Sequence, residues 1–219
     1  FANGKIATHN AEINYQERYD DWQSNFIKDE SGNVVTHKTR TGKEEAALTK
    51  DARKPFDKDR PSGSAEKHTD MDHIIPTAEI IRDAAANAHM TKEERIEFGN
   101  SNVNTHEMDS SQNRSKGDMP IEDWLDNSNA NGQKPNEIFN ISAEEDREYR
   151  EKDRISREEY EKRKNDGEQK SIKSGKKSQK EEAFRISGKA LRAVVMSLLA
   201  DLVKEIIAKL IKWFKSVQK

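Results

Sequence analysis

Three short groups of polar residues carry the side chains in this sequence that could do chemistry. The first is residues 72–76 (Asp-His-Ile-Ile-Pro), the second is the single residue Asn104, and the third is residues 113–118 (Asn-Arg-Ser-Lys-Gly-Asp). Carboxylate and amide oxygens suit a hard cation such as Mg²⁺, and an imidazole takes up a proton near neutral pH. Each group alone is a weak signal, because such residues occur by chance in many proteins. Their order and spacing together favour a catalytic centre.

In this order the three groups resemble the motif of the HNH endonuclease family. The resemblance covers about residues 67–119, a quarter of the chain, and it is especially close for residues 113–118. The third signature position is His in some members and Asn in others, among them the HNH domain of RNA-guided DNA-cutting effectors. The resemblance implies a ββα-metal fold, in which two short strands and a helix hold one divalent metal. It also implies a metal-dependent endonuclease that hydrolyses phosphodiester bonds of DNA.

The resemblance gives a role to each residue that matches the motif. It makes Asp72 and Asn113 the protein ligands of one divalent cation, which we expect to be Mg²⁺, with Mn²⁺ as the alternative. Two protein oxygens leave coordination positions open for water and phosphate. His73 is the expected general base, and Asn104 is expected to steady His73 and its loop. Since a wrongly turned ring is a poor base, His73 also needs an acceptor, for which a backbone carbonyl near Asn104 is suitable.

Three other residues near the motif are candidates for contacts with substrate or metal. Arg114 and Lys116 belong to the last motif segment and are expected to bind phosphate groups, which positions DNA without reading bases. His106 could be an additional metal ligand, a phosphate contact or simply an exposed residue. The family often braces its fold with two Cys-x-x-Cys zinc pairs, whereas this chain has no cysteine. We therefore expect the helices of residues 78–98, inserted between the two strands, to brace it.

The helices and strands that we expect around these residues make the protein α+β and mostly helical. Capping and turn residues set most of the expected boundaries, such as the Thr91-Lys-Glu-Glu94 capping box and the turn that contains Gly32. The expected elements, in order, are a hairpin over 25–28 and 34–38, a helix over 44–53, a loop over 55–63, a strand over 67–72, helices over 78–89, 92–98 and 109–116, a loop over 126–136, and helices over 142–164 and 182–216.

The chain is expected to have four regions. These are an N-terminal hairpin-plus-helix region that packs on the nuclease (1–60), an HNH nuclease core (61–140), a charged helical spacer followed by a basic linker (141–181), and an amphipathic C-terminal helix (182–219). Between Ser142 and Lys164 there are 9 acidic and 8 basic residues and few large apolar ones. Such a helix has almost nothing to bury. We expect it to be a solvated spacer that ends at the Asn-Asp-Gly of residues 165–167.

Composition excludes a compact enzyme that uses the whole chain around one centre. Charged residues make up 37% of the sequence and hydrophobic residues 32%, whereas an average globular protein is about 25% charged. The net charge is −2, but residues 170–219 hold 13 basic and 4 acidic residues, a surplus of +9. This basic quarter suits a polyanion, either nucleic acid or an anionic membrane, or it is the solvated face of a helix.

The apolar C-terminal segment suggests a second class of function. Residues 182–217 could bind another copy of the chain or a protein partner, and less readily a membrane surface. The longest uncharged stretch there, Ala193–Ala200, is too short to cross a bilayer, which needs about 20 apolar residues. The alternative to the nuclease is thus a non-catalytic helical protein, in which 142–217 forms an oligomerising or membrane-associated stalk and the N-terminal unit only binds nucleic acid. Without cysteine or a visible secretory signal, we expect a cytoplasmic location, and the nuclease could be a bacterial defence effector.

Overall fold

The computed structural model describes residues 13–185, Lys204 and Lys209. Within these residues the protein is α+β and mostly helical, with two small antiparallel sheets, which confirms the predicted fold class at this level. The amphipathic helix predicted over 182–219, with the partner surface expected on 182–217, falls almost entirely outside the described residues. In the part of the chain that is described, no helix has both the length and the apolar composition needed to cross a bilayer.

The chain divides into two compact units. One is formed by residues 17–168, and the other by the two terminal segments, residues 1–16 and 169–219. Every residue predicted for the catalytic centre belongs to the first unit. In the second unit, the hydroxyl groups of Tyr15 and Ser171 share a hydrogen bond of 3.0 Å.

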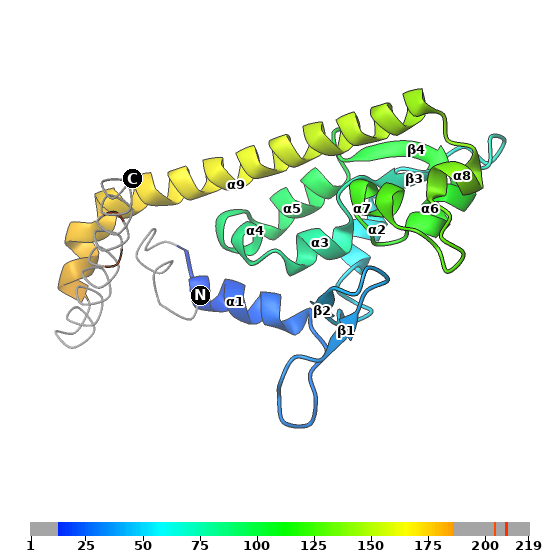
Figure 1. The fold of residues 1–219 in the computed structure, drawn as a ribbon. Helices are drawn as coiled ribbons and strands as arrows, with labels where there is room; N and C mark the ends of the chain where they lie inside the picture. Colours follow the sequence, from blue (N-terminus) through cyan, green and yellow to red (C-terminus); the bar gives the residue numbers. More distant parts are fainter. Residues whose placement is uncertain (1–12, 186–203, 205–208, 210–219) are drawn as a thin grey trace, which may run out of the picture. The chain divides into compact units, whose positions relative to one another are not determined.

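The described helices and strands follow one another along the chain as Figure 1 labels them. They are α1 (Tyr15–Ser24), β1 (Thr36–Lys38), β2 (Glu44–Ala46), α2 (Lys54–Lys58), β3 (Thr69–His73), α3 (Thr77–Arg82), α4 (Ala84–His89), α5 (Lys92–Gly99), β4 (Thr105–Asp109), α6 (Ser110–Lys116), α7 (Ile121–Asp126), α8 (Pro135–Phe139) and α9 (Ala143–Arg185).

The N-terminal hairpin is confirmed, but the helix predicted after it is wrong. The Val35 N–H donates to the Ile27 carbonyl at 2.9 Å, as expected for the two hairpin segments. The predicted helix over 44–53 instead begins with β2, which pairs antiparallel with β1. The turn between them contains Gly42 at φ 82°, a left-handed backbone that glycine adopts without strain. Residues 44–46 contain no local signal of this pairing, because the partner strand lies elsewhere in the sequence.

Two further predictions in this part of the chain, a loop over 55–63 and a helix over 78–89, need correction. Residues 54–58 form α2 rather than a loop, because Pro55 stands in the first turn, where its missing N–H costs nothing. The single helix predicted over 78–89 is divided at Asp83 into α3 and α4. Asp83 has an extended backbone, and its carboxylate accepts hydrogen bonds from the N–H groups of Ala85 and Ala86. It therefore caps α4 instead of continuing α3.

A two-stranded sheet and the helix that follows it hold most of the predicted site. β3 and β4 are antiparallel and register Asp72 opposite His106, and helices α3, α4 and α5 are inserted between the two strands. The Asp109 carboxylate accepts from the N–H groups of Ser111 and Gln112, so α6 begins directly where β4 ends. Helix α6 then packs on both strands. The short helix predicted over 109–116 is confirmed.

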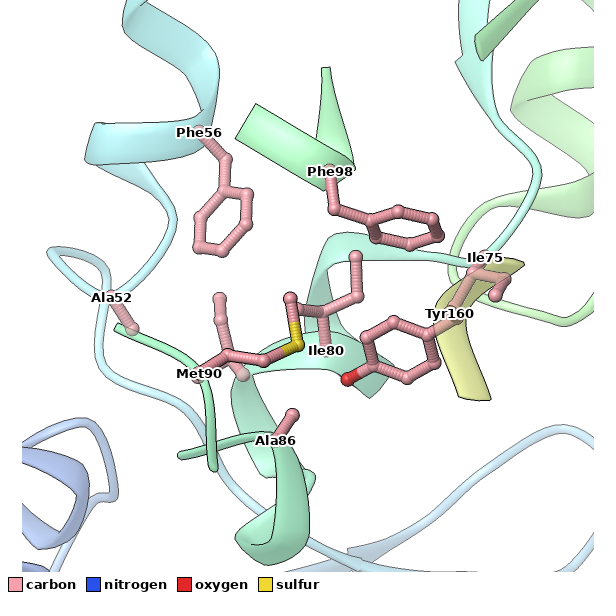
Figure 2. Packing of buried hydrophobic residues seen from close by; sticks show 9 residues of the cluster. Ala52, Phe56, Ile75, Ile80, Ala86, Met90, Phe98 and Tyr160 are labelled. Carbon is pink, nitrogen blue, oxygen red and sulfur yellow. The ribbon is translucent and has the colours of Figure 1, made fainter. Parts of the chain in front are cut away.

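Two apolar clusters fix the end of β3. Ile74 belongs to a cluster with Met108 and Trp124, while its neighbour Ile75 belongs to a second cluster with Phe98. Figure 2 shows the second cluster, where the rings of Phe98 and Tyr160 are stacked with their centroids 4.8 Å apart. Because consecutive side chains are buried in different clusters, the backbone that follows His73 is held from both sides.

Helix α9 packs on the fold, which contradicts its predicted role as a solvated spacer. Tyr160 is 3% exposed, and Ser156 and Asp153 are also buried. These residues recur at spacings of three and four, so they share one face of the helix. Some charged residues of the remaining surface pair within the helix, as Arg154 does with Glu158, and others pair with the rest of the fold, as Arg163 does with Glu97. The helix also continues through residues 165–167 and through the predicted linker to Arg185.

Gly167 allows a close contact between α9 and the end of α4, which gives a testable prediction. A Cβ atom at this position would overlap the His89 carbonyl oxygen. Alanine favours a helix by about 1 kcal/mol over glycine, but here we expect Gly167→Ala to destabilise the fold by about 1–3 kcal/mol through overpacking. Urea unfolding measures the change. The control is Asp166→Ala at the exposed neighbouring position, which should stay within about 0.5 kcal/mol. A Gly167→Ala protein as stable as wild type would contradict this contact.

Candidate functional site

The carboxylate of Asp72 lies in a buried cluster of charged and polar groups between the β3–β4 sheet and α6. His106, which is opposite Asp72 on β4, approaches Asp72 Oδ2 through its Nε2 at 3.1 Å. The Lys116 ammonium, from the last turn of α6, donates to Asp72 Oδ1 at 2.9 Å and to the His73 carbonyl at 3.0 Å. All three side chains are nearly inaccessible: 4% of Asp72, 4% of His106 and 1% of Lys116 is exposed.

This cluster corrects two expectations. Lys116 was predicted to bind phosphate, but its ammonium is buried and neutralises Asp72. His106 is not an exposed residue, because it lies against Asp72. Its ring also packs edge to face on the Tyr149 ring, with the two ring centroids 5.5 Å apart. Burial acts to raise the pKa of the Asp72 carboxyl, but Lys116 and His106 together outweigh it and hold that pKa below its usual value. Asp72 is therefore a carboxylate with both oxygens engaged.

His73 ends β3 with one ring nitrogen fixed and the other available. Its Nε2 lies 2.9 Å from Oδ1 of Asn100, whose Nδ2 donates to the Phe56 carbonyl at 2.9 Å. This second bond orients the amide, so Nε2 of His73 must carry the proton and Nδ1 the free lone pair. Nδ1 forms no hydrogen bond within the described residues, but it is not completely buried. It therefore retains contact with solvent, in a residue that is only 6% exposed.

The surroundings of His73 favour a neutral ring. Burial is the main cause that lowers the pKa of His73, and the hydrogen bond with Asn100 opposes it. The positive charge of Arg60 lowers the pKa of His73 further. At neutral pH the ring is thus unprotonated and can accept a proton at Nδ1. The orienting group is the side chain of Asn100, where a backbone carbonyl near Asn104 had been expected.

Asn104 acts as a clamp between β4 and the loop after His73. Its Oδ1 accepts from the Ile75 N–H and from the Ser156 hydroxyl, both at 2.8 Å. Its Nδ2 donates to the carbonyls of Ile75 and Gly99, both at 3.1 Å. The side chain is fully buried, and these four bonds satisfy its donors and most of its acceptor capacity. The contacts agree with the expectation that Asn104 steadies this loop, and they add Ser156 of α9 as a partner.

Asn113 lies next to Asp70, a residue that the motif did not identify. Its Nδ2 is 3.4 Å from Asp70 Oδ2. Within the described residues, the Asn113 side chain thus bonds to Asp70 rather than to Asp72. Both residues line an open pocket of about 520 Å³ with Arg60, Gly63 and the start of β3. Asp70 could have been found from the sequence, because residues two apart on a strand share a face. The Asp70-Met-Asp72 pattern therefore puts both carboxylates on the side that α6 covers.

The side chains on this side are of the types that a hard cation binds. Asp70, Asp72 and Asn113 offer carboxylate and amide oxygens, which Mg²⁺ prefers. The Lys116 ammonium, held by Asp72 Oδ1 and the His73 carbonyl, is a stand-in that marks this position as favourable for positive charge. A cation bound by Asp72 must take the place of that ammonium on the carboxylate. Among the described residues, no group of three or more His, Cys, Asp or Glu side chains is arranged so that it could hold a metal ion.

Arg114 is exposed, as a phosphate contact requires. Its Nε donates to the Ser110 carbonyl at 2.9 Å within α6, one residue from Asn113. Its role in binding phosphate stays a prediction. No family model, curated protein or solved structure matches this chain.

Proposed function

We propose that this protein is a metal-dependent endonuclease of the HNH type that hydrolyses DNA. The observation that carries the proposal is the state of His73. Its Nε2 is fixed by Asn100 and its Nδ1 is unpaired and not completely buried, at the end of a strand that also bears Asp70 and Asp72. The order of two antiparallel strands and a helix, with Asn113 on that helix, supports the same proposal because the resemblance implies it.

In this reaction His73 is the general base. Its Nδ1 removes a proton from a water molecule, whose oxygen attacks phosphorus. The bond from phosphorus to the leaving oxygen breaks, and that oxygen takes a proton from solvent. Asn100 holds the ring in the tautomer that can accept a proton, and Asn104 holds the loop that carries it. A positioned base of this kind contributes about 10²–10⁴-fold to a rate.

One divalent cation, Mg²⁺ or alternatively Mn²⁺, belongs to the proposal. Asp72 and Asn113 would hold it as the resemblance implies, and Asp70 is a third oxygen donor beside Asn113. When bound, the cation supplies charge neutralisation at phosphorus. One centre cuts one strand, so a double-strand break needs two copies of the chain or two visits. A homo-oligomer through 182–217 would supply two copies, and we keep a cytoplasmic location and a role in bacterial defence as parts of the proposal.

Cleavage by the purified full chain tests this function. Supercoiled plasmid, linear duplex and single-stranded DNA should each be incubated with Mg²⁺ or Mn²⁺, and parallel samples should contain EDTA. We expect nicked or linear products that depend on the added cation, and RNA serves as a comparison substrate. Absence of cleavage for every DNA form with both cations would overturn the nuclease proposal. In that case the non-catalytic interaction protein, which sedimentation and liposome flotation can examine, becomes the better account.

A further inference from the structure

Arg60 lies at the mouth of the pocket that Asp70 and Asn113 line. The residue follows α2, and its guanidinium donates to the carbonyl of Met71 on β3, through Nε at 3.1 Å and also through Nη2. Arg60 itself is exposed and is one of the residues that line the pocket. The guanidinium is thus held against the strand that ends in His73, and it keeps contact with solvent.

Within the described residues, the remaining nitrogen of this guanidinium is unpaired. In the described residues, Nη1 of Arg60 forms no hydrogen bond, and no carboxylate lies within ion-pair distance. Arg82 and Arg157, by contrast, form ion pairs with Glu45 and Glu79. An anchored guanidinium has lost much of its rotamer freedom before a ligand arrives, which favours binding. Its fork suits a phosphate oxygen.

We propose that Arg60 binds a phosphate group of the nucleic-acid substrate and so positions the backbone over the pocket. This inference rests on the proposed nuclease function, and it gives Arg60 the role that had been expected of Lys116. Lys116 is buried against Asp72, whereas Arg60 presents its charge at the pocket. Because Asp70 and Asn113 line the same pocket, a phosphate held by Arg60 lies near these two oxygen donors.

Binding of labelled DNA by the full chain in EDTA, where no cleavage occurs, tests this role. We compare wild type with Arg60→Ala and Arg60→Lys by fluorescence anisotropy over a range of salt concentrations. Loss of one charge-assisted phosphate contact should raise Kd about tenfold. It should also lower the slope of log K against log[salt] by about 1. Arg60→Lys should restore the slope, because it keeps the charge, and recover only part of the affinity, because it lacks the fork.

Arg147→Ala is the matched control. Arg147 is also an exposed arginine whose Nε donates to a backbone carbonyl, that of Ala143 at 3.2 Å, but it lies on α9 and does not line the pocket. Its replacement should leave Kd and the salt slope unchanged. An Arg60→Ala protein with wild-type Kd and slope would overturn the inference, as would a wild-type chain that binds neither duplex nor single-stranded DNA. A wild-type chain that binds through Arg60 but never cleaves would overturn the nuclease proposal alone.

Discussion

Replacing His73 with alanine is expected to lower the rate of DNA cleavage by about 10²–10⁴-fold, which is the usual contribution of a general base. The variant loses the unpaired Nδ1 lone pair, while Asp70, Asp72 and Asn113 remain. Affinity for DNA in EDTA should change little, because a neutral ring adds no charge. Single-turnover cleavage of a labelled duplex with Mg²⁺ measures the rate, and circular dichroism checks the helix content.

Two further variants show whether a loss of cleavage in His73→Ala is specific to the general base. His37→Ala removes an exposed histidine from β1, away from the sheet of the site, and should cleave at the wild-type rate. Asn100→Ala keeps the base but frees Nε2, so the ring can adopt the wrong tautomer or turn, and the loss should be smaller than for His73→Ala. A His73→Ala protein that cuts as fast as wild type would remove His73 from the mechanism.

Replacing Lys116 with methionine is expected to lower the free energy of unfolding by about 3–5 kcal/mol. Methionine has nearly the length of lysine, so packing is preserved, but the Asp72 carboxylate loses its ammonium partner in a site that is 4% exposed. An unpaired buried charge is much more costly than a lost surface ion pair, which is worth about 0–1 kcal/mol. Urea unfolding followed by circular dichroism measures the change.

The double variant Asp72→Asn/Lys116→Met separates the charge from the packing. Removing both charges leaves a neutral amide that can still accept from His106, so the double variant should be more stable than Lys116→Met alone. Arg114→Met, at an exposed position of the same helix, should stay within about 0.5 kcal/mol. Asp72→Asn alone completes the comparison: if its effect and that of Lys116→Met simply add in the double variant, the buried pair is not the source of the stability.

Elements with local signals were predicted well from the sequence. The capping box at Thr91 begins α5, and the one at Ser142 begins α9. The strand β2 was missed because its stability depends on pairing with β1, and nothing in residues 44–46 themselves announces that partner. The end of α9 was misplaced because Gly167 is usually a sign of helix termination. In this fold the missing Cβ serves a close contact with His89 instead.

The sequence identified which residues form the site better than it identified their contacts. Spacing identified His73 and Asn104, whose bonds agree with the expected geometry of a fixed ring and a clamped loop. Spacing could not show that the head group of Lys116 points inward, because a lysine on a short helix is usually solvated. Asn100 was missed as well, since its contact with His73 depends on how α5 ends beside α2. Such contacts are decided by tertiary packing, which a motif does not contain.

The hydroxyl of Ser156 on α9 donates to Asn104 Oδ1 inside the fold. A gene product shortened to the motif-bearing stretch, such as residues 1–140, would thus lose the Ser156 donor to Asn104 and the Tyr160 ring that covers Phe98. The smallest fragment worth expressing for activity should reach at least residue 168. Loss of activity on deeper trimming would then report a damaged interior, and it would say nothing about a tether or recruitment device.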